Sequence, residues 1–259
     1  MQKEIFIYVH IPKCFGTSFL DSIRNNEINN NPNINKNLAW FDIFHRMYAQ
    51  LYPSRFYKIV PNNDQEVTYF KTSILPHFLV SKKNKLLIHL HQDTWNIDKV
   101  IPKEIKRTYI VTVREPKSRL ISAYKYRLQQ MKTDHLYSDA NWSTSYFFEN
   151  AGFYNGPERL IPRIFGIKEE YILPKHLMEN IVLIDIDEYN KKGHIIQKLE
   201  KDIGIKLDPC HTNASAFNTL LPGANDVEFW IRMKDKYKKE LRYYTFLINN
   251  NFSDLFLNY

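Results

Sequence analysis

The hydrophobic residues of this chain fall into short runs that are separated by helical patterns. The runs lie at residues 4–10, 85–93, 107–115 and 180–189 and are rich in β-branched and aromatic residues, which is typical of strands. Their apolar residues are contiguous rather than strictly alternating, as expected for strands that are buried on both faces of a parallel sheet. The pattern therefore predicts strands at these positions.

Helices are predicted between these runs. The segment 116–131 begins with a proline, which is well tolerated at the first position of a helix. Further helices are expected over about 188–202 and, as one or two segments, over 226–250. Apolar and aromatic residues at three- and four-residue spacing also predict an amphipathic helix between Trp40 and Leu51.

The alternation of strands and helices predicts an α/β fold with three layers, in which helices flank a central and mainly parallel sheet, as in P-loop proteins. In such a fold ligands bind at the carboxyl ends of the strands. Neither an internal repeat nor a linker rich in Pro, Gly and Ser divides the 259 residues, so we expect a single domain over residues 1–259.

The composition indicates a globular protein with a basic surface. Hydrophobic residues make up 44% and charged residues 25% of the chain. The net charge of +8 favours polyanions, nucleotides or acidic glycans as partners. The two cysteines, Cys14 and Cys210, form no disulfide framework, and the first apolar run is too short for a signal peptide or a membrane span. We therefore expect a cytoplasmic protein.

The stretch "YVHIPKCFGTSFLDSI" (8–23) places a lysine and a glycine between a predicted strand and a predicted helix. Backbone amides at a helix start lack internal acceptors and lie at the positive end of the helix dipole, so this turn is a candidate anion site. Gly16 allows close approach of the backbone, Thr17 and Ser18 offer hydroxyl donors, and Lys13 adds a full charge. The turn lacks the Gly-Lys-Ser/Thr ending that holds magnesium in a P-loop, which argues against a metal-dependent NTPase or kinase.

A second candidate element is "VTVREPKSRLISAYKY" (111–126), in which Arg114 ends a predicted strand and Ser122 lies on the following helix. The planar, permanently charged fork of arginine suits a phosphate. Taken alone, each residue is better explained as a structural one, with Arg114 in a cap or an ion pair and Ser122 on a helix surface.

Together these motifs resemble those of a known family. "HIPKCFGTS" (10–18) is similar to the "HIPKTGGTS" turn that binds the 5′-phosphosulfate in carbohydrate sulfotransferases of the heparan sulfate 2-O-sulfotransferase type. "VREPKSRLISAYKY" (113–126) resembles their 3′-phosphate motif, and "HTNASAFNTLLPG" (211–223) resembles their C-terminal part.

The resemblance implies transfer of a sulfuryl group from 3′-phosphoadenosine 5′-phosphosulfate to an acceptor hydroxyl, without a metal. Lys13 would stabilise the charge on the departing phosphate oxygen. Arg114 and Ser122 would bind the 3′-phosphate. The donor-binding residues implied by the resemblance are Lys13, Cys14, Phe15, Gly16, Thr17, Ser18, Arg114 and Ser122.

A general base is expected in the segment "LLIHLHQD" (86–93), which resembles the His-Gly-His segment of glycan 2-O-sulfotransferases. The match makes His91 the base and leaves His89 as the second candidate. A histidine pKa near neutrality suits proton transfer. If the segment is a strand, both histidines point to one face, so the sequence does not separate them.

The expected acceptor is a glycan or another hydroxylated molecule, and the net charge of +8 favours an acidic one. The main alternative is a catalytically inactive nucleotide- or glycan-binding module of the same fold, because Phe15 stands where the family usually has glycine. A nucleic-acid-binding protein would use the positive charge and the many aromatic residues. We do not expect nucleic acid as the partner, because those aromatic residues recur mostly at the spacing of buried helix and strand positions.

Overall fold

The computed structural model of the protein describes the strands, several helices and the segments beside them. The described residues are 2–11, Cys14, Phe19, 38–43, Thr68, 70–82, 84–90, 101–123, 156–165, 179–187, Gln197, Glu200, Lys201 and 227–249, and within these the side chains of 38–43, 89–90, 163–165, 227–230 and 232 are not described.

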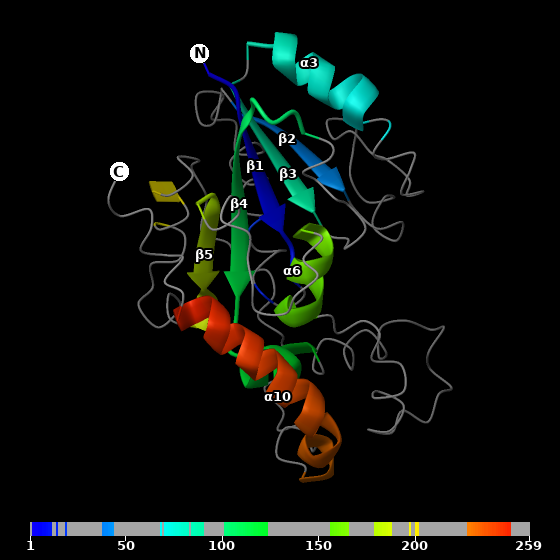
Figure 1. The fold of residues 1–259 in the computed structure, drawn as a ribbon, viewed down its shortest axis with the longest axis vertical. Coiled ribbons are helices and arrows are strands. Elements are labelled where there is room, and N and C mark those ends of the chain that lie inside the picture. The colour runs from blue at the N-terminus through cyan, green and yellow to red at the C-terminus, as the bar shows by residue number, and fades with distance from the viewer. Residues whose placement is uncertain are drawn as a thin grey trace, which may run out of the picture.

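A parallel sheet forms the centre of the fold (Figure 1). Its five strands are arranged in the order β2-β3-β1-β4-β5, and every neighbouring pair is parallel. With the helices that flank it, this sheet confirms the predicted α/β class. The strands are β1 (Glu4–Val9), β2 (Leu38–Ile43), β3 (Lys85–Leu90), β4 (Lys106–Val113) and β5 (Ile181–Asp185).

The strand order places a ligand site beside β1. After β1 the chain runs to β2 at one edge and returns to β3, and it then crosses β1 to form β4 and β5 on the other side. The carboxyl ends of β1 and β4 are therefore neighbours at the point where the chain changes direction, which is where open α/β sheets bind ligands. Both predicted donor motifs follow these two strands.

Several helices accompany the sheet. Residues 116–123 are helical from Pro116 onward, and Gln197, Glu200 and Lys201 are helical within the segment 188–202, both as predicted. The C-terminal segment forms one helix rather than two, and it packs against α6 below the carboxyl ends of β4 and β5 in Figure 1. The named helices are η2 (Phe70–Ile74), α3 (Leu75–Val80), α6 (Pro157–Phe165) and α10 (Val227–Asn249).

The prediction of a helix between Trp40 and Leu51 is wrong for its first residues, because residues 38–43 form strand β2. Their backbone pairs along its whole length with β3, from Leu38 opposite Lys85 to Ile43 opposite Leu90. Aromatic residues fit a strand as well as a helix, and the hydrogen bonds to a distant strand decide between the two. Residues 44–51 lie outside the described part of the chain.

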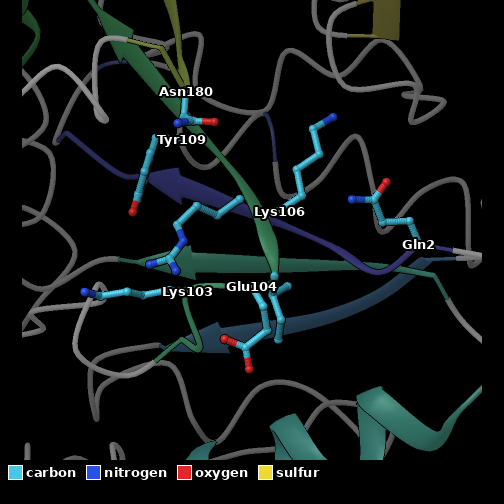
Figure 2. Close-up of a pocket in the computed structure, with 8 residues that line it drawn as sticks. Gln2, Lys103, Glu104, Lys106, Tyr109 and Asn180 are labelled. Atoms are coloured by element: carbon cyan, nitrogen blue, oxygen red, sulfur yellow. The ribbon is translucent and has the colours of Figure 1, made fainter.

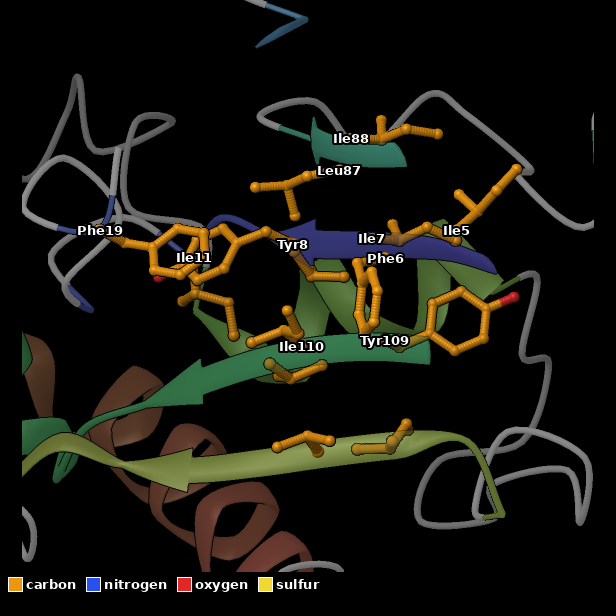
Figure 3. Close-up of a cluster of buried hydrophobic side chains, with 14 of the residues drawn as sticks. Ile5, Phe6, Ile7, Tyr8, Ile11, Phe19, Leu87, Ile88, Tyr109 and Ile110 are labelled. Carbon is orange, nitrogen blue, oxygen red and sulfur yellow. The ribbon is translucent and has the colours of Figure 1, made fainter. Parts of the chain in front are cut away.

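The core is built around β1, whose residues from Ile5 to Val9 are all buried (Figure 3). Since successive side chains of a strand point to opposite faces, this continuous burial means that both faces of the sheet are covered. The contiguous apolar run of β1 thus reflects burial on both faces of a parallel sheet, as predicted. Helical residues complete the core: Phe70, Ile74, Leu75, Phe78, Leu160, Ile161, Tyr243 and Leu247.

One ion pair lies inside this apolar environment. Arg119, on the helix that begins at Pro116, and Glu240, on α10, have fully buried side chains with an exposed fraction of 0% each. The Nε–H and one terminal amino group of Arg119 donate to the two carboxylate oxygens of Glu240, the latter over 2.6 Å. The pair is bidentate, the strongest geometry for arginine and a carboxylate.

A second glutamate approaches this pair at the start of α6. Gly156 precedes α6, and a Cβ atom there would lie 2.1 Å from Oε2 of Glu158 and 2.8 Å from Cδ of Glu240. Both carboxyl groups are therefore packed against the backbone of Gly156, and a side chain at this position would have to displace them. Burial, followed by the nearby charge of Glu240, raises the pKa of Glu158.

We expect Glu240→Gln to lower the free energy of unfolding by about 3–5 kcal/mol, because it leaves the buried charge of Arg119 uncompensated. Urea denaturation of the purified protein measures this loss. The double variant Arg119→Met/Glu240→Leu removes both charges and should recover most of the stability.

Glu104 is exposed and provides the matched control, since Glu104→Gln should change the free energy of unfolding by no more than about 0.5 kcal/mol. Equal effects of Glu240→Gln and Glu104→Gln would contradict the structural role of the buried pair.

Candidate functional site

The candidate site is the edge of the sheet where β1, β4 and β5 end. The chain turns directly after β1, because the backbone N–H of Cys14 donates to the carbonyl of Ile11 over 3.1 Å. In the sequence Pro12 follows Ile11, which suits the second position of such a turn. This turn opens the stretch that is predicted to bind the donor.

Buried hydroxyl groups hold the turn on the end of β4. The hydroxyl of Thr112 donates to the carbonyl of Cys14 over 2.5 Å, and the hydroxyl of Tyr8 lies 2.8 Å from the same Thr112 oxygen. The hydroxyl of Tyr8 is also placed to donate to the carbonyl of Cys14, over 3.3 Å, and either hydroxyl can be the donor between Tyr8 and Thr112. The three residues form a chain of hydrogen bonds that joins β1, β4 and the turn.

Tyr8 also supports the residues that follow the turn. Its ring stacks on that of Phe19, with ring centroids 4.2 Å apart and planes only 12° from parallel (Figure 3). Phe19 is helical and fully buried. Burial raises the pKa of Tyr8, so its hydroxyl stays protonated and remains a donor. The segment between Cys14 and Phe19 is thus anchored at both ends.

The side chain of Cys14 points into the protein rather than to solvent. The residue is fully buried, and burial raises the pKa of its thiol to about 12, although the charge of nearby Arg119 opposes the shift. The thiol is therefore protonated and unreactive at neutral pH. What Cys14 offers to the described structure is its carbonyl, which fixes the turn.

Arg114 lies directly after β4 and is partly exposed, with 28% of its side chain accessible. Its Nε–H donates to Oδ1 of Asp187 over 3.2 Å, and the other oxygen of Asp187 accepts the backbone N–H of Glu115 over 3.0 Å. The two terminal amino groups of Arg114 have no partner among the described residues. The guanidinium therefore keeps donors available at the edge where the strands end.

The helix after β4 is capped by its own sequence. The carboxylate of Glu115 accepts the backbone N–H groups of Lys117 over 2.9 Å and of Ser118 over 2.7 Å. A side chain with this geometry satisfies the first free amides of a helix. The amides at this helix start are thus occupied, and an anion bound here would be held by side chains. Ser122, predicted to be one of them, lies on this helix and is partly exposed.

Most of the other predicted site residues lie outside the described part of the chain. They are Lys13, Phe15, Gly16, Thr17, Ser18 and His91, together with the C-terminal motif 211–223. His89 lies in β3, opposite Tyr8 of β1 and Asp42 of β2, and its side chain is not described. The described structure brings the segment at Cys14 and Arg114 to neighbouring strand ends.

Sequence reasoning missed the residues that support the site. Asp187 follows β5 and belongs to the segment 180–189 that was predicted as a strand. Nothing in that sequence marks it as a partner of Arg114. Tyr8 and Thr112 read as ordinary strand residues. The one available signal was that each polar residue stands at or near the carboxyl end of an apolar run.

A pocket of about 600 Å³ lies at the opposite edge of the sheet (Figure 2). Gln2, Lys106 and Asn180 line it, and they lie at the amino ends of β1, β4 and β5. Two of its cations have partners in the fold: Lys106 pairs with Glu4 at 2.8 Å, and Arg107 donates to the carbonyl of Pro102 at 2.9 Å. This pocket is therefore separate from the candidate site.

Two kinds of feature are absent from the described residues. Among them, no group of three or more His, Cys, Asp or Glu side chains is arranged to hold a metal ion. Within that part of the chain, no helix has the length and apolar character needed to cross a membrane.

The fold is that of a sulfotransferase. The chain is similar to the crystal structure of a sulfotransferase from Alicyclobacillus acidocaldarius, with a TM-score of 0.51 over 98% of this chain and 99% of that one. The two sequences are only 12% identical, so this likeness concerns the fold alone. A comparison with curated proteins gave no match.

The sequence identifies the family directly. The model of the Sulfotransfer_2 group, described as the sulfotransferase family, matches residues 2–156. This chain belongs to the sulfotransferase family, as its motifs predicted. The matched part contains β1 to β4 and both predicted donor motifs, and it ends just before α6 begins at Pro157. The single domain and the cytoplasmic location stay predictions of the sequence.

We expect Thr112→Val to lower the free energy of unfolding by about 0.5–1.5 kcal/mol, because it removes the shorter hydrogen bonds of the buried Tyr8 hydroxyl and Cys14 carbonyl and leaves their longer bond to each other, at 3.3 Å. Thr112→Ser keeps the hydroxyl and should cost clearly less. Urea denaturation of both variants, and of each combined with Tyr8→Phe, measures the coupling between the two hydroxyls. Equal losses for Val and Ser would show that the hydroxyl does not hold the turn.

Proposed function

We propose that the protein transfers a sulfuryl group from 3′-phosphoadenosine 5′-phosphosulfate to a hydroxyl group of a glycan or another hydroxylated acceptor. The observation that carries this proposal is the convergence of two motifs in a chain of the sulfotransferase family. The turn after β1 and Arg114 after β4 lie at the adjacent ends of neighbouring strands.

The described residues fit a donor with a second phosphate. Arg114 uses only its Nε–H within the described structure, and its terminal amino groups match two oxygens of a phosphate. Asp187 and Glu115 carry negative charge beside it, so an anion is held by directed donors rather than by a general positive potential. In this proposal Arg114 and Ser122 bind the 3′-phosphate, which distinguishes the donor from nucleotides such as AMP.

The turn after β1 would hold the 5′-phosphosulfate. Its backbone amides, with Gly16, Thr17 and Ser18, contact the phosphate, and Lys13 stabilises the charge that develops on the bridging oxygen as the sulfur–oxygen bond breaks. The chain of bonds from Tyr8 through Thr112 to Cys14 keeps this turn fixed relative to β4. Alignment of donor and acceptor then supplies much of the rate enhancement.

A histidine would remove the proton from the acceptor hydroxyl as the oxygen attacks sulfur. His91 is the first candidate, and His89 is the second. β3 ends at Leu90, beside β1, so both residues belong to the strand end next to the donor turn in the sheet order. The scheme requires no metal. The net charge of +8 supports an acidic acceptor.

The alternative function is binding alone, in which the protein is a nucleotide- or glycan-binding module that does not transfer sulfuryl groups. Phe15, in place of the glycine usual in the family, supports it, because a side chain there restricts the backbone at the donor turn. This module would bind the 3′-phosphorylated nucleotide with the same residues and fail only in the transfer assay.

We expect the protein to bind 3′-phosphoadenosine 5′-phosphate and to bind 5′-AMP much more weakly. Isothermal titration calorimetry of both nucleotides measures this preference. Arg114→Ala should raise the dissociation constant of the 3′-phosphorylated nucleotide by about 10- to 100-fold, the range for a lost charge-assisted bond. Binding of 5′-AMP should change little.

Arg159 is exposed at the start of α6, and Arg159→Ala is the matched control for the loss of one positive charge. If wild-type protein binds neither nucleotide, the donor assignment is wrong. If Arg159→Ala weakens binding as much as Arg114→Ala, the effect is one of general charge.

We expect His91→Ala to reduce the rate of sulfuryl transfer by about 10²–10⁴-fold while donor binding is largely kept. Lys13→Ala should reduce the rate by a similar factor, and by more than it weakens donor binding. The rate is measured with radiolabelled donor over a panel of glycan acceptors, and binding is measured by calorimetry.

His77→Ala, at an exposed position of α3, is the control for loss of a histidine. A large loss in His89→Ala with an active His91→Ala protein would move the role of the base to His89. No transfer to any acceptor by a protein that binds the donor would favour the module without turnover.

A further inference from the structure

The carboxylate of Asp187 holds Arg114 in two ways at once. One oxygen accepts the Nε–H of the Arg114 side chain over 3.2 Å, and the other accepts the next backbone N–H, that of Glu115, over 3.0 Å. A rigid planar group thus connects the guanidinium to the main chain at the end of β4. The rotation of the Arg114 side chain is thereby restricted, and within the described residues its bond to Asp187 uses the Nε–H and neither terminal amino group.

Asp187 is itself held by β5 and α10. Its backbone N–H donates to Oδ1 of Asp185 over 3.0 Å, and Oδ2 of Asp185 accepts the hydroxyl of Tyr244 over 2.5 Å. Burial and the bond to Asp185 raise the pKa of Tyr244, which keeps this hydroxyl protonated as a donor. A continuous set of contacts therefore runs from the C-terminal helix to Arg114.

A simple ion pair does not explain this arrangement. The side chains of Arg114 and Asp187 are 28% and 23% exposed, and partly exposed pairs contribute little to stability. A carboxylate beside an anion site also repels the anion. The position of the Asp187 carboxylate is explained if it orients Arg114. An arginine that is already oriented loses less conformational entropy when it binds phosphate, so the benefit is a higher affinity for the ligand.

We propose that Asp187 is a positioning residue that orients Arg114 toward the 3′-phosphate of the donor and so sets the preference for 3′-phosphorylated nucleotides. The proposal rests on the proposed function, and it adds a residue from outside the part of the chain that matches the family model. Tyr244 and Asp185 act one step further away, by fixing the backbone at Asp187.

Calorimetric titration of Asp187→Ala with 3′-phosphoadenosine 5′-phosphate and with 5′-AMP tests the proposal. We expect the dissociation constant of the 3′-phosphorylated nucleotide to rise about tenfold, with a change of less than about twofold for 5′-AMP. The selectivity ratio, defined as the dissociation constant of 5′-AMP divided by that of the 3′-phosphorylated nucleotide, therefore falls. Loss of negative charge alone predicts the opposite sign, since it would strengthen phosphate binding.

Tighter binding of the 3′-phosphorylated nucleotide by Asp187→Ala, or an equal change for both nucleotides, overturns the proposal. Asp187→Asn decides the question if the alanine variant does not fold: its uncharged amide loses one of the two acceptors, and a smaller loss of the same selectivity is expected. An unchanged selectivity ratio in a folded Asp187→Asn protein also overturns it.

Two further variants complete the design. Asp235→Ala removes an exposed acid of α10 and should leave the ratio unchanged, whereas Tyr244→Phe should lower it in the same direction as Asp187→Ala. The wild-type titration separates this inference from the proposed function. If wild-type protein does not prefer the 3′-phosphorylated nucleotide, the donor assignment fails; if it does and Asp187→Ala keeps the preference, only the positioning role fails.

Discussion

A buried ion pair between Arg119 and Glu240 joins the helix that follows Arg114 to the C-terminal helix. The residues are 121 positions apart in sequence, and both side chains are fully removed from solvent. Neither charge is tolerated without the other in such an environment, so the two helices are held in one relative position. Arg119 also acts on the thiol of Cys14 through its charge, which places the pair near the donor turn. The geometry of the site therefore depends on a contact that no local pattern contains.

Polar contacts at three strand ends extend this constraint to the candidate site. Thr112 and Tyr8 hold the turn after β1 by hydroxyl groups, and Asp187 holds Arg114 after β4 by a carboxylate. The backbone of the sheet positions these strand ends, and the side chains select one arrangement of the segments that leave them. The parallel sheet thus brings the groups together, and the buried hydrogen bonds fix their directions, which is what transfer between two aligned substrates requires.

The predicted site motifs and several of the residues that support them come from different parts of the chain. Residues 2–156 match the sulfotransferase family and include the predicted donor motifs, while Asp185, Glu240 and Tyr244 come from the remainder. The motifs are readable in a single sequence because their chemistry requires particular residues at a strand end. The residues that support them need only present a carboxylate or a hydroxyl at one point in space, and many sequences can do so.

The sequence alone determined the strands β1, β3, β4 and β5 and their parallel arrangement, and it placed the two predicted donor motifs after β1 and β4. It did so because a strand that is buried on both faces of a sheet needs an apolar residue at nearly every position, and such a run is visible in the sequence itself. The tertiary structure decided that residues 38–43 pair with β3 instead of forming a helix. It also decided that Arg114 binds Asp187 and that Arg119 binds Glu240. Hydrogen bonds and ion pairs between distant segments have no period in the sequence. Their partners are defined only when folding has brought the strand ends and the C-terminal helix together.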